Sequence, residues 1–272
     1  MHRLLALALT LALALATIAP PTAAVVLSTT STADLGAVHF TSGDLVETDP
    51  PAVVLHQADW FVGSVNIDAV TRLGNTWLVS TADTETTLSG LTVLDGDIVA
   101  LNPDSGSASI WFNEGLFGTD EDLDALDLWP DGRVLLSTTT AAVLGGLTFA
   151  AGDLALYDPR TNLAALYWRA ADWFLGSPNT DAVAHLANGD LLLSTTSDGT
   201  TTGGLSFLDG DILRFDGSAL TLWWAESHFA ADEDVDALDV AVPVPGTLAL
   251  LLAGWLCFRR CDPLTHHWRT AC

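Results

Sequence analysis

The sequence predicts an all-β protein, a four-bladed β-propeller closed by pairing of its N- and C-terminal strands, with an apolar helix before it and another after it. Three observations lead to this fold. Short sequence markers recur four times in one order, each recurrence contains four strand-like segments, and one repeat is divided between the two ends of the domain. A repeat with a period of this length is typical of propellers and solenoids.

Three residue pairs mark the repeats, at spacings of 52 to 58 residues. The Gly-Asp pairs are Gly43-Asp44, Gly96-Asp97, Gly152-Asp153 and Gly210-Asp211. The Ser-Thr pairs begin at Ser28, Ser80, Ser137 and Ser194, and the Asp-Ala pairs begin at Asp68, Asp124, Asp181 and Asp236. We expect both sets of aspartates to fix turns by accepting hydrogen bonds from nearby backbone N–H groups.

The third copy displays the repeating unit most clearly. Strand-like segments at 124–129, 133–138, 153–157 and 163–168 are separated by turn signals such as Pro130-Asp131-Gly132, and a short extra strand is expected at 147–149. Four short antiparallel strands in a repeat of this size are typical of one propeller blade.

The divided repeat predicts how the domain closes. The domain begins with a second strand at 25–29 and ends with a first strand at 235–240. Together these strands would complete the fourth blade, and the closed ring would remove exposed sheet edges. A β-sandwich and an open solenoid of four β units are the alternatives.

Each predicted inner strand begins with an Asp-Ala pair, and in this respect the chain resembles hemopexin-type four-bladed propellers. That resemblance implies an axial channel that can hold cations. The repeats also alternate in pairs, because 58–61 matches 171–174 and 120–124 matches 232–236. A duplicated two-blade unit would make opposite blades alike.

Residues 1–24 read as a secretory signal peptide. Arg3 precedes the apolar run 4–16, and prolines and small residues follow, which is the order of an export signal. We expect cleavage after Ala24, and a buried N-terminal helix is the alternative. The folded domain then spans residues 25–241.

Residues 242–272 combine a Pro-rich break, a short apolar helix and an arginine pair. This segment resembles a PEP-CTERM sorting signal. The matching residues are Val242, Pro243, Pro245, Gly246, Thr247, Arg259 and Arg260, with Val244 where that family carries Glu. The resemblance implies processing by an exosortase-type enzyme of bacteria that make exopolysaccharide. The helix would be about 18 Å long, which is short for an unaided permanent span of the roughly 30 Å hydrocarbon core. We expect an exported protein at the outer surface or outside the cell, transiently or stably anchored in the inner membrane by this segment.

Composition narrows the function. Residues 25–241 contain 33 acidic residues, five arginines and no lysine, which repels nucleic acid. The same range has no cysteine, so it has no disulfide and neither a thiol nor a lysine nucleophile. No nucleophile elbow or phosphate-binding loop is present. A hydrolase that uses two carboxylates stays open.

Two acidic segments are the candidate cation sites. Their carboxylates recur at i, i+2 and i+4, a spacing that would point all three to one side of an extended segment. The residues are Asp120, Asp122 and Asp124 in one segment and Asp232, Asp234 and Asp236 in the other. Ca²⁺ is the cofactor that several oxygen ligands suggest, and a solvated acidic loop is the alternative.

Aromatic residues cluster on the outer strands and in the loops after them. The set comprises Trp60, Trp111, Phe112, Tyr167, Trp168, Trp173, Trp223 and Trp224. Such residues pack blades together, and the alternative is stacking on sugar rings. We therefore expect a non-catalytic exported surface or extracellular-matrix protein that binds a partner such as polysaccharide, with Ca²⁺. The alternatives are a glycan-active hydrolase and a structural surface-layer component.

Overall fold

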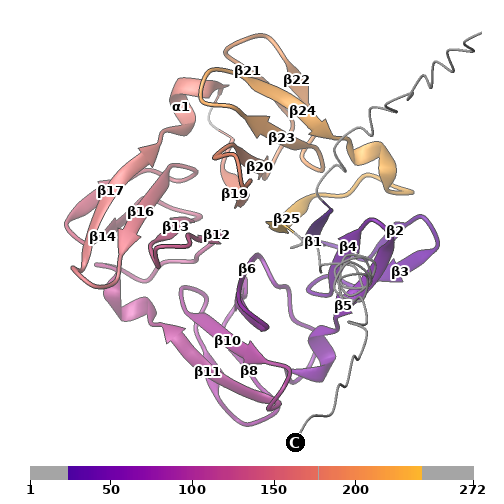
Figure 1. The fold of residues 1–272 in the computed structure, drawn as a ribbon, viewed down its shortest axis with the longest axis vertical. Helices are drawn as coiled ribbons and strands as arrows, with labels where there is room; N and C mark the ends of the chain where they lie inside the picture. The colour runs from indigo at the N-terminus through magenta and orange to yellow at the C-terminus, as the bar shows by residue number, and fades with distance from the viewer. Residues whose placement is uncertain (1–23, 177, 241–272) are drawn as a thin grey trace, which may run out of the picture.

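A computed structural model describes residues 24–176 and 178–240. Within these residues the protein is all-β, with only short helical turns between its strands (Figure 1). The predicted signal peptide before Ala24 and the sorting segment 242–272 lie outside the described residues. No helix in the described ranges is long and apolar enough to cross a membrane.

Four antiparallel sheets of four strands form the main part of the described residues. Sheet 1 has the order β25 (Val235–Val240), β1 (Val25–Thr29), β4 (Leu45–Thr48) and β5 (Pro51–Leu55). Sheet 2 consists of β6 (Ala69–Leu73), β7 (Thr76–Ser80), β10 (Ile98–Asn102) and β11 (Ser107–Phe112). Sheet 3 consists of β12 (Ala125–Leu128), β13 (Val134–Ser137), β16 (Leu154–Asp158) and β17 (Leu163–Trp168). Sheet 4 consists of β19 (Thr180–His185), β20 (Leu191–Thr195), β23 (Ile212–Phe215) and β24 (Leu220–Trp224).

The four sheets surround a common centre in Figure 1, with the first strand of each sheet innermost. The inner strands are β25, β6, β12 and β19, and each contacts the inner strands of two neighbouring sheets. These contacts bring the Asp-Ala pairs of all four repeats to the centre of the protein.

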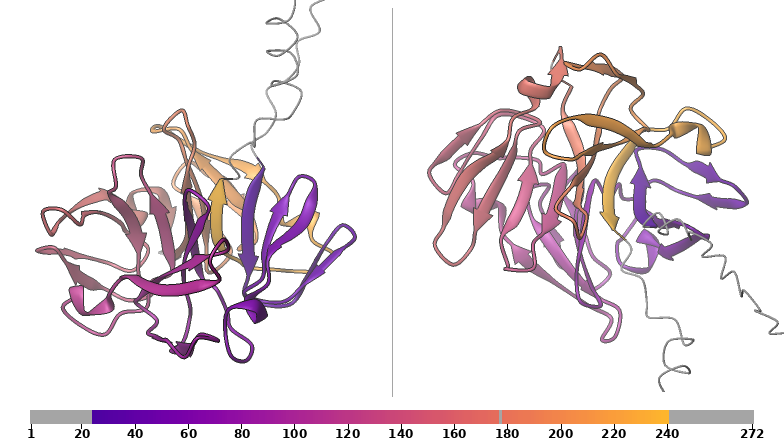
Figure 2. Two further views of the ribbon diagram at one scale, coloured as in Figure 1. Left: turned by 60° about the horizontal axis from the view of Figure 1, so that its bottom comes forward. Right: turned by 45° about the horizontal axis from the view of Figure 1, so that its top comes forward.

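The two ends of the described chain share one sheet. β1 pairs antiparallel with β25, with Val25 opposite Val240 and Leu27 opposite Leu238. The indigo β1 and the yellow β25 run side by side in Figures 1 and 2. The predicted combination of 25–29 with 235–240 in one sheet is therefore present.

Each repeat also carries a small hairpin between its second and third strands. The hairpins are β2 (Ala33–Leu35) with β3 (Val38–Phe40), β8 (Glu85–Thr86) with β9 (Thr92–Val93), β14 (Ala142–Leu144) with β15 (Leu147–Phe149), and β21 (Gly199–Thr201) with β22 (Ser206–Phe207), which β18 (Phe174–Leu175) extends. The extra strand expected at 147–149 is β15, and the structure adds its hairpin partner. A short helical turn follows each outer strand: η1 (Gln57–Asp59), η2 (Glu114–Leu116), α1 (Ala170–Trp173) and η3 (Glu226–His228).

The core consists of four apolar clusters, each between two neighbouring sheets. Leu78, Leu126 and Leu136, for example, are fully or almost fully buried between sheets 2 and 3. Burial of one such side chain stabilises the fold by about 1.5–3 kcal/mol. Phe112 and Trp168 are each only 4% exposed, so these two outer-strand aromatics pack between sheets as predicted.

The aspartate of each Gly-Asp pair ties the loop before the third strand to the helical turn after the fourth, and the glycine packs against the segment that leads to the next sheet. The Asp97 carboxylate accepts hydrogen bonds from the backbone N–H groups of Leu94 at 3.0 Å and Glu114 at 2.8 Å. Asp44, Asp153 and Asp211 accept the equivalent pairs of bonds, which confirms their turn-fixing role. A Cβ atom on Gly96 would lie 2.2 Å from the carbonyl oxygen of Glu121, so only glycine lets the loop approach the next repeat this closely.

Candidate functional site

Four aspartates meet where the inner strands begin. Asp68, Asp124, Asp181 and Asp236 are each 3–6% exposed. Burial, followed by the charges of neighbouring aspartates, raises the pKa of Asp68 and Asp181 well above the usual range. Burial raises the pKa of Asp236 to about 8. We refer to these four residues, together with Asp122 and Asp234, as the acidic end.

The acidic end contains more carboxylates than hydrogen-bond donors. Asn66 Nδ2 donates to Asp236 Oδ2 at 2.8 Å, and Asn179 Nδ2 donates to Asp124 Oδ2. Both carboxylate oxygens of Asp181 are buried without a donor. Asp122 lies within hydrogen-bonding reach of Asp68, and Asp234 lies within reach of Asp181. Such pairs of acids can share a proton or a cation, because two neighbouring carboxylates repel each other when both are ionised.

Further along the same strands the acids face bases. The Asp127 carboxylate lies 2.5 Å from His185 Nδ1, and the Asp239 carboxylate lies 3.5 Å from Arg72 Nε. The hydrogen bond between His185 and the Asp127 carboxylate raises the pKa of His185, and burial raises the pKa of Asp239 to about 7. We refer to these four residues as the paired end.

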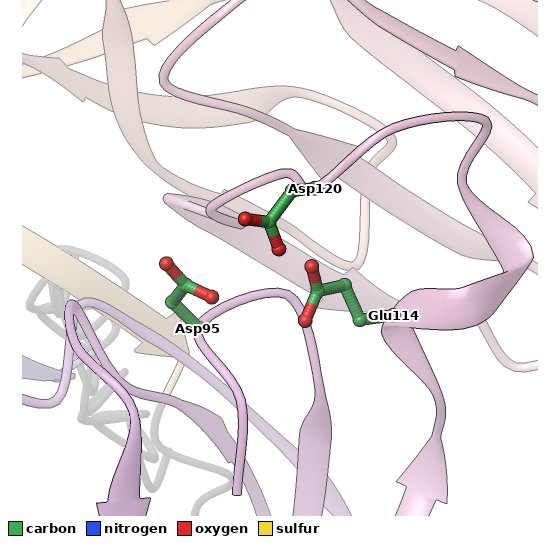
Figure 3. Close-up of side chains that lie close together, drawn as sticks. All are labelled: Asp95, Glu114 and Asp120. Carbon is green, nitrogen blue, oxygen red and sulfur yellow. The ribbon is translucent and has the colours of Figure 1, made fainter.

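The predicted cation ligands occupy three different environments. Asp120 lies beside Asp95 and Glu114, and one oxygen of each residue lies within 4.8 Å of the other two (Figure 3). Asp232 forms the same arrangement with Asp209 and Glu226. We refer to these triads as the Glu114 cluster and the Glu226 cluster.

The other four predicted ligands belong to the acidic end: Asp122 and Asp234 lie beside Asp68 and Asp181, whereas Asp124 and Asp236 accept hydrogen bonds from asparagines. Residues 120–124 are not a strand, so the two-residue alternation of strand side chains does not apply to them. Cation binding by these four aspartates stays a prediction.

Sequence reasoning missed four members of the clusters: Asp95, Glu114, Asp209 and Glu226. Asp95 and Asp209 lie two residues before the aspartates of the second and fourth Gly-Asp pairs. Glu114 and Glu226 each donate a backbone N–H to the carboxylate of that same aspartate. Alignment of the four repeats on the Gly-Asp marker would have shown that both pairs occur only in alternate repeats.

Four shallow grooves lie between neighbouring repeats, and each contains a tryptophan. The largest, with a volume of about 680 Å³, is lined by Trp111, Asn113, Tyr157 and Asn162 among others. The Tyr157 hydroxyl donates to Asn162 Oδ1 at 2.9 Å. Asn162 has a φ of 53°, the one positive φ of a non-glycine residue in the described ranges. None of these four grooves is lined by more than one carboxylate residue.

Comparison with known proteins identifies no family. No family of proteins matches the sequence, and no curated protein matches it. Among solved structures, a protein of unknown function from Bacteroides caccae is 9% identical, with a TM-score of 0.36 over 80% of this chain and 98% of that chain. The extracellular domain of a putative hybrid two component system from B. thetaiotaomicron is 12% identical, with a TM-score of 0.34 over 75% of this chain. This chain spans 33% of that protein's length.

Proposed function

We propose that this chain is an exported, non-catalytic four-bladed β-propeller that binds a neutral polysaccharide at the cell surface or in the extracellular matrix. The four sheets are its blades, and the pairing of β1 with β25 closes the ring. The repeated strand order and the contacts among the four inner strands support this architecture. A closed ring leaves no inner sheet edge open to pairing with another chain.

The ends of the sequence support export. The signal-like residues 1–24 would direct secretion. The segment 242–272 would present the protein to an exosortase-type enzyme and hold it in the inner membrane until it reaches the outer surface. Residues 25–241 carry a formal net charge of −28, which disfavours nucleic acid and acidic polymers as partners.

The groove around Trp111 is the proposed binding site for the polysaccharide. A half-buried tryptophan beside two asparagine side chains combines an apolar platform with hydrogen-bonding amides. This combination suits a sugar ring, which presents C–H groups on one face and hydroxyl groups at its edge. The fixed backbone and hydrogen-bonded amide of Asn162 present one geometry to a ligand without prior rearrangement.

Affinity electrophoresis of the full chain in gels that contain dextran or hydroxyethyl cellulose tests this proposal. We expect at least one neutral polymer to retard the protein, and we expect Trp111→Ala to reduce the retardation at least fivefold. Leu73→Ala is the matched control, because Leu73 is 51% exposed and lies outside the four grooves. Equal retardation of both variants, or none by either polymer, would contradict polysaccharide binding in this groove.

A glycan-active hydrolase is the second candidate function. Such enzymes require two carboxylates that flank one bound sugar. The four grooves offer at most one, Asp59 in the groove beside Trp60. The hydrolase therefore has less support than the binding protein. Self-association that increases with protein concentration, without any glycan, would favour the surface-layer alternative.

A further inference from the structure

Two of the four repeats bring three acidic residues together in space, and the other two repeats have neutral residues at the corresponding sequence positions. The acidic sets are Asp95, Glu114 and Asp120 in one repeat and Asp209, Glu226 and Asp232 two repeats later. The corresponding residues of the other two repeats are Ser42, Gln57 and Ser64, and Ala151, Ala170 and Ser177. The backbone N–H groups of Gln57, Glu114, Ala170 and Glu226 all bond to the Gly-Asp carboxylate, which fixes the correspondence of the central position. The first position directly precedes each Gly-Asp pair, and the third lies four residues before each Asp-Ala pair. The fold therefore accepts neutral residues here, and two of its four repeats carry three acids instead.

The central glutamate of each cluster has a buried oxygen without a donor. Glu114 is 4% exposed, and its Oε1 accepts a hydrogen bond from the Glu121 N–H at 3.3 Å. Its Oε2 is buried and has no hydrogen-bond donor, and Glu226 Oε2 is in the same state. The carboxylate of Glu114 faces Asp95 and Asp120 in Figure 3.

A neighbouring buried glutamate, Glu121, differs from Glu114 in its hydrogen bonds. The two carboxylate oxygens of Glu121 accept hydrogen bonds from the hydroxyl groups of Thr119 and Thr140. The fold thus provides donors for both oxygens of Glu121, whereas one oxygen of Glu114 has no donor and faces two further acids. An unpaired buried carboxylate is costly unless a cation or a proton neutralises it.

We propose that each cluster binds one Ca²⁺ ion. The ligand oxygens lie within 4.8 Å of one another, and two oxygens on opposite sides of a Ca²⁺ ion are separated by about twice 2.4 Å. Asp120 and Asp232 are exposed, so water can complete the coordination shell on the outer side. Ca²⁺ accepts such an irregular set of oxygens, whereas Mg²⁺ requires a near-ideal octahedron.

These ions would fasten neighbouring sheets together. Asp95 lies in the loop before β10, Glu114 lies in η2 after β11, and Asp120 lies in the segment that leads to β12 of sheet 3. The Glu114 site therefore joins sheet 2 to sheet 3. The Glu226 site joins sheet 4 to β25 of sheet 1, the sheet that contains both ends of the described chain. This inference is independent of glycan binding.

Isothermal titration of the EDTA-treated full chain with CaCl₂ tests the proposal. We expect Glu114→Gln and Glu226→Gln each to remove one bound Ca²⁺ per chain relative to the unmodified chain, and the double variant to remove two. Glutamine is the natural residue at the equivalent position 57, so these variants should fold. Asp172→Asn is the matched control, because Asp172 is an exposed carboxylate outside both clusters and should leave the stoichiometry unchanged.

Thermal melts of the same variants supply a second readout. A Ca²⁺ concentration one hundred times its Kd should raise the Tm of the unmodified chain. The rise should be smaller in each single variant and smallest in the double variant. Absence of Ca²⁺ binding would overturn the proposal and leave a proton shared between Glu114 and Asp120. A stoichiometry that neither glutamine variant lowers would also overturn it. Tighter binding of MgCl₂ than of CaCl₂ would overturn the assignment to Ca²⁺.

Discussion

The acidic end and the paired end belong to the same inner strands, yet they neutralise buried acids in different ways. At the paired end, Asp127 lies against His185 and Asp239 lies against Arg72. At the acidic end, the ionisable neighbours of Asp181 are three further acids, Asp234, Asp124 and Asp236. At the paired end burial raises the pKa of both acids, but a base lowers each pKa in turn and so favours the charged form. At the acidic end the neighbouring acids add to the effect of burial, so a carboxylate there must give up its charge to a proton or a cation. Substitutions at the two ends should therefore have unequal effects.

Loss of a carboxylate at the paired end should have the largest effect. Asp127→Ala removes the hydrogen-bonded partner of His185, and a hydrogen bond to a charged group contributes about 1.5–3 kcal/mol. The strand itself tolerates alanine here, because Ala184 occupies the equivalent position of β19. We expect the free energy of unfolding in urea at pH 6 with EDTA to fall by about 2 kcal/mol. The exposed-site control Asp172→Ala should change it by less than about 0.5 kcal/mol, and equal losses in both variants would remove the special role of the pair.

Asp236 at the acidic end should contribute more to the pH dependence of stability than Asp239 at the paired end, because burial raises the pKa of Asp236 to about 8 and that of Asp239 to about 7. The folded-state pKa of Asp236 is raised to about 8, above its ordinary value, so the folded protein holds a proton that the unfolded chain releases. This contribution is present below the unfolded pKa of about 3.9 and is lost as the pH rises through 8. Between pH 5 and 7 the folded protein holds one more proton than the unfolded chain. The free energy of unfolding therefore falls by about 1.4 kcal/mol for each unit by which the pH rises.

Asp236→Asn should reduce this slope by about 1 kcal/mol per pH unit in EDTA, measured by urea unfolding at several pH values. Asp158→Asn provides the comparison, because hydrogen bonds from Arg160 lower the pKa of Asp158 and move its titration below this range. A slope that Asp236→Asn leaves unchanged would show that the folded protein does not hold a proton on Asp236 in this pH range.

Loss of charge at the acidic end should have the smallest effect. Asp181 has no donor on either oxygen, and burial raises its pKa, which favours the protonated form. An asparagine side chain at this position would retain the shape of the protonated acid and one donor group toward Asp234. Because the raised pKa favours that protonated form, we expect Asp181→Asn to change the free energy of unfolding at pH 6 in EDTA by less than about 0.5 kcal/mol. A loss as large as that of Asp127→Ala would make the two ends equivalent.

The predicted strands and the observed ones agree because strand patterns are local. The third repeat shows this best, since strands expected at 133–138, 153–157 and 163–168 correspond to β13, β16 and β17. The pairing of β1 with β25 followed from the repeat order alone. The inner aspartates could be placed at strand starts because each directly precedes a strand-like run in the sequence.

The candidate clusters were harder to predict because their members come from three separate segments. Asp95 is in a loop, Glu114 is in a helical turn, and Asp120 is in an irregular connection. Their proximity depends on the close approach at Gly96, which spacing along a strand does not encode. The i, i+2, i+4 pattern at 120–124 describes strand geometry, and this segment has none.

The pairing of Val25 with Val240 has a topological consequence. Because these residues lie opposite each other on adjacent strands, a short peptide linker could join them without disturbing sheet 1. New termini could then be opened at the exposed turn 103–106, between β10 and β11. Such a circular permutant would keep every strand pair and every interface between sheets. The linear order of the repeats is thus one of several orders that the same arrangement of sheets can accommodate.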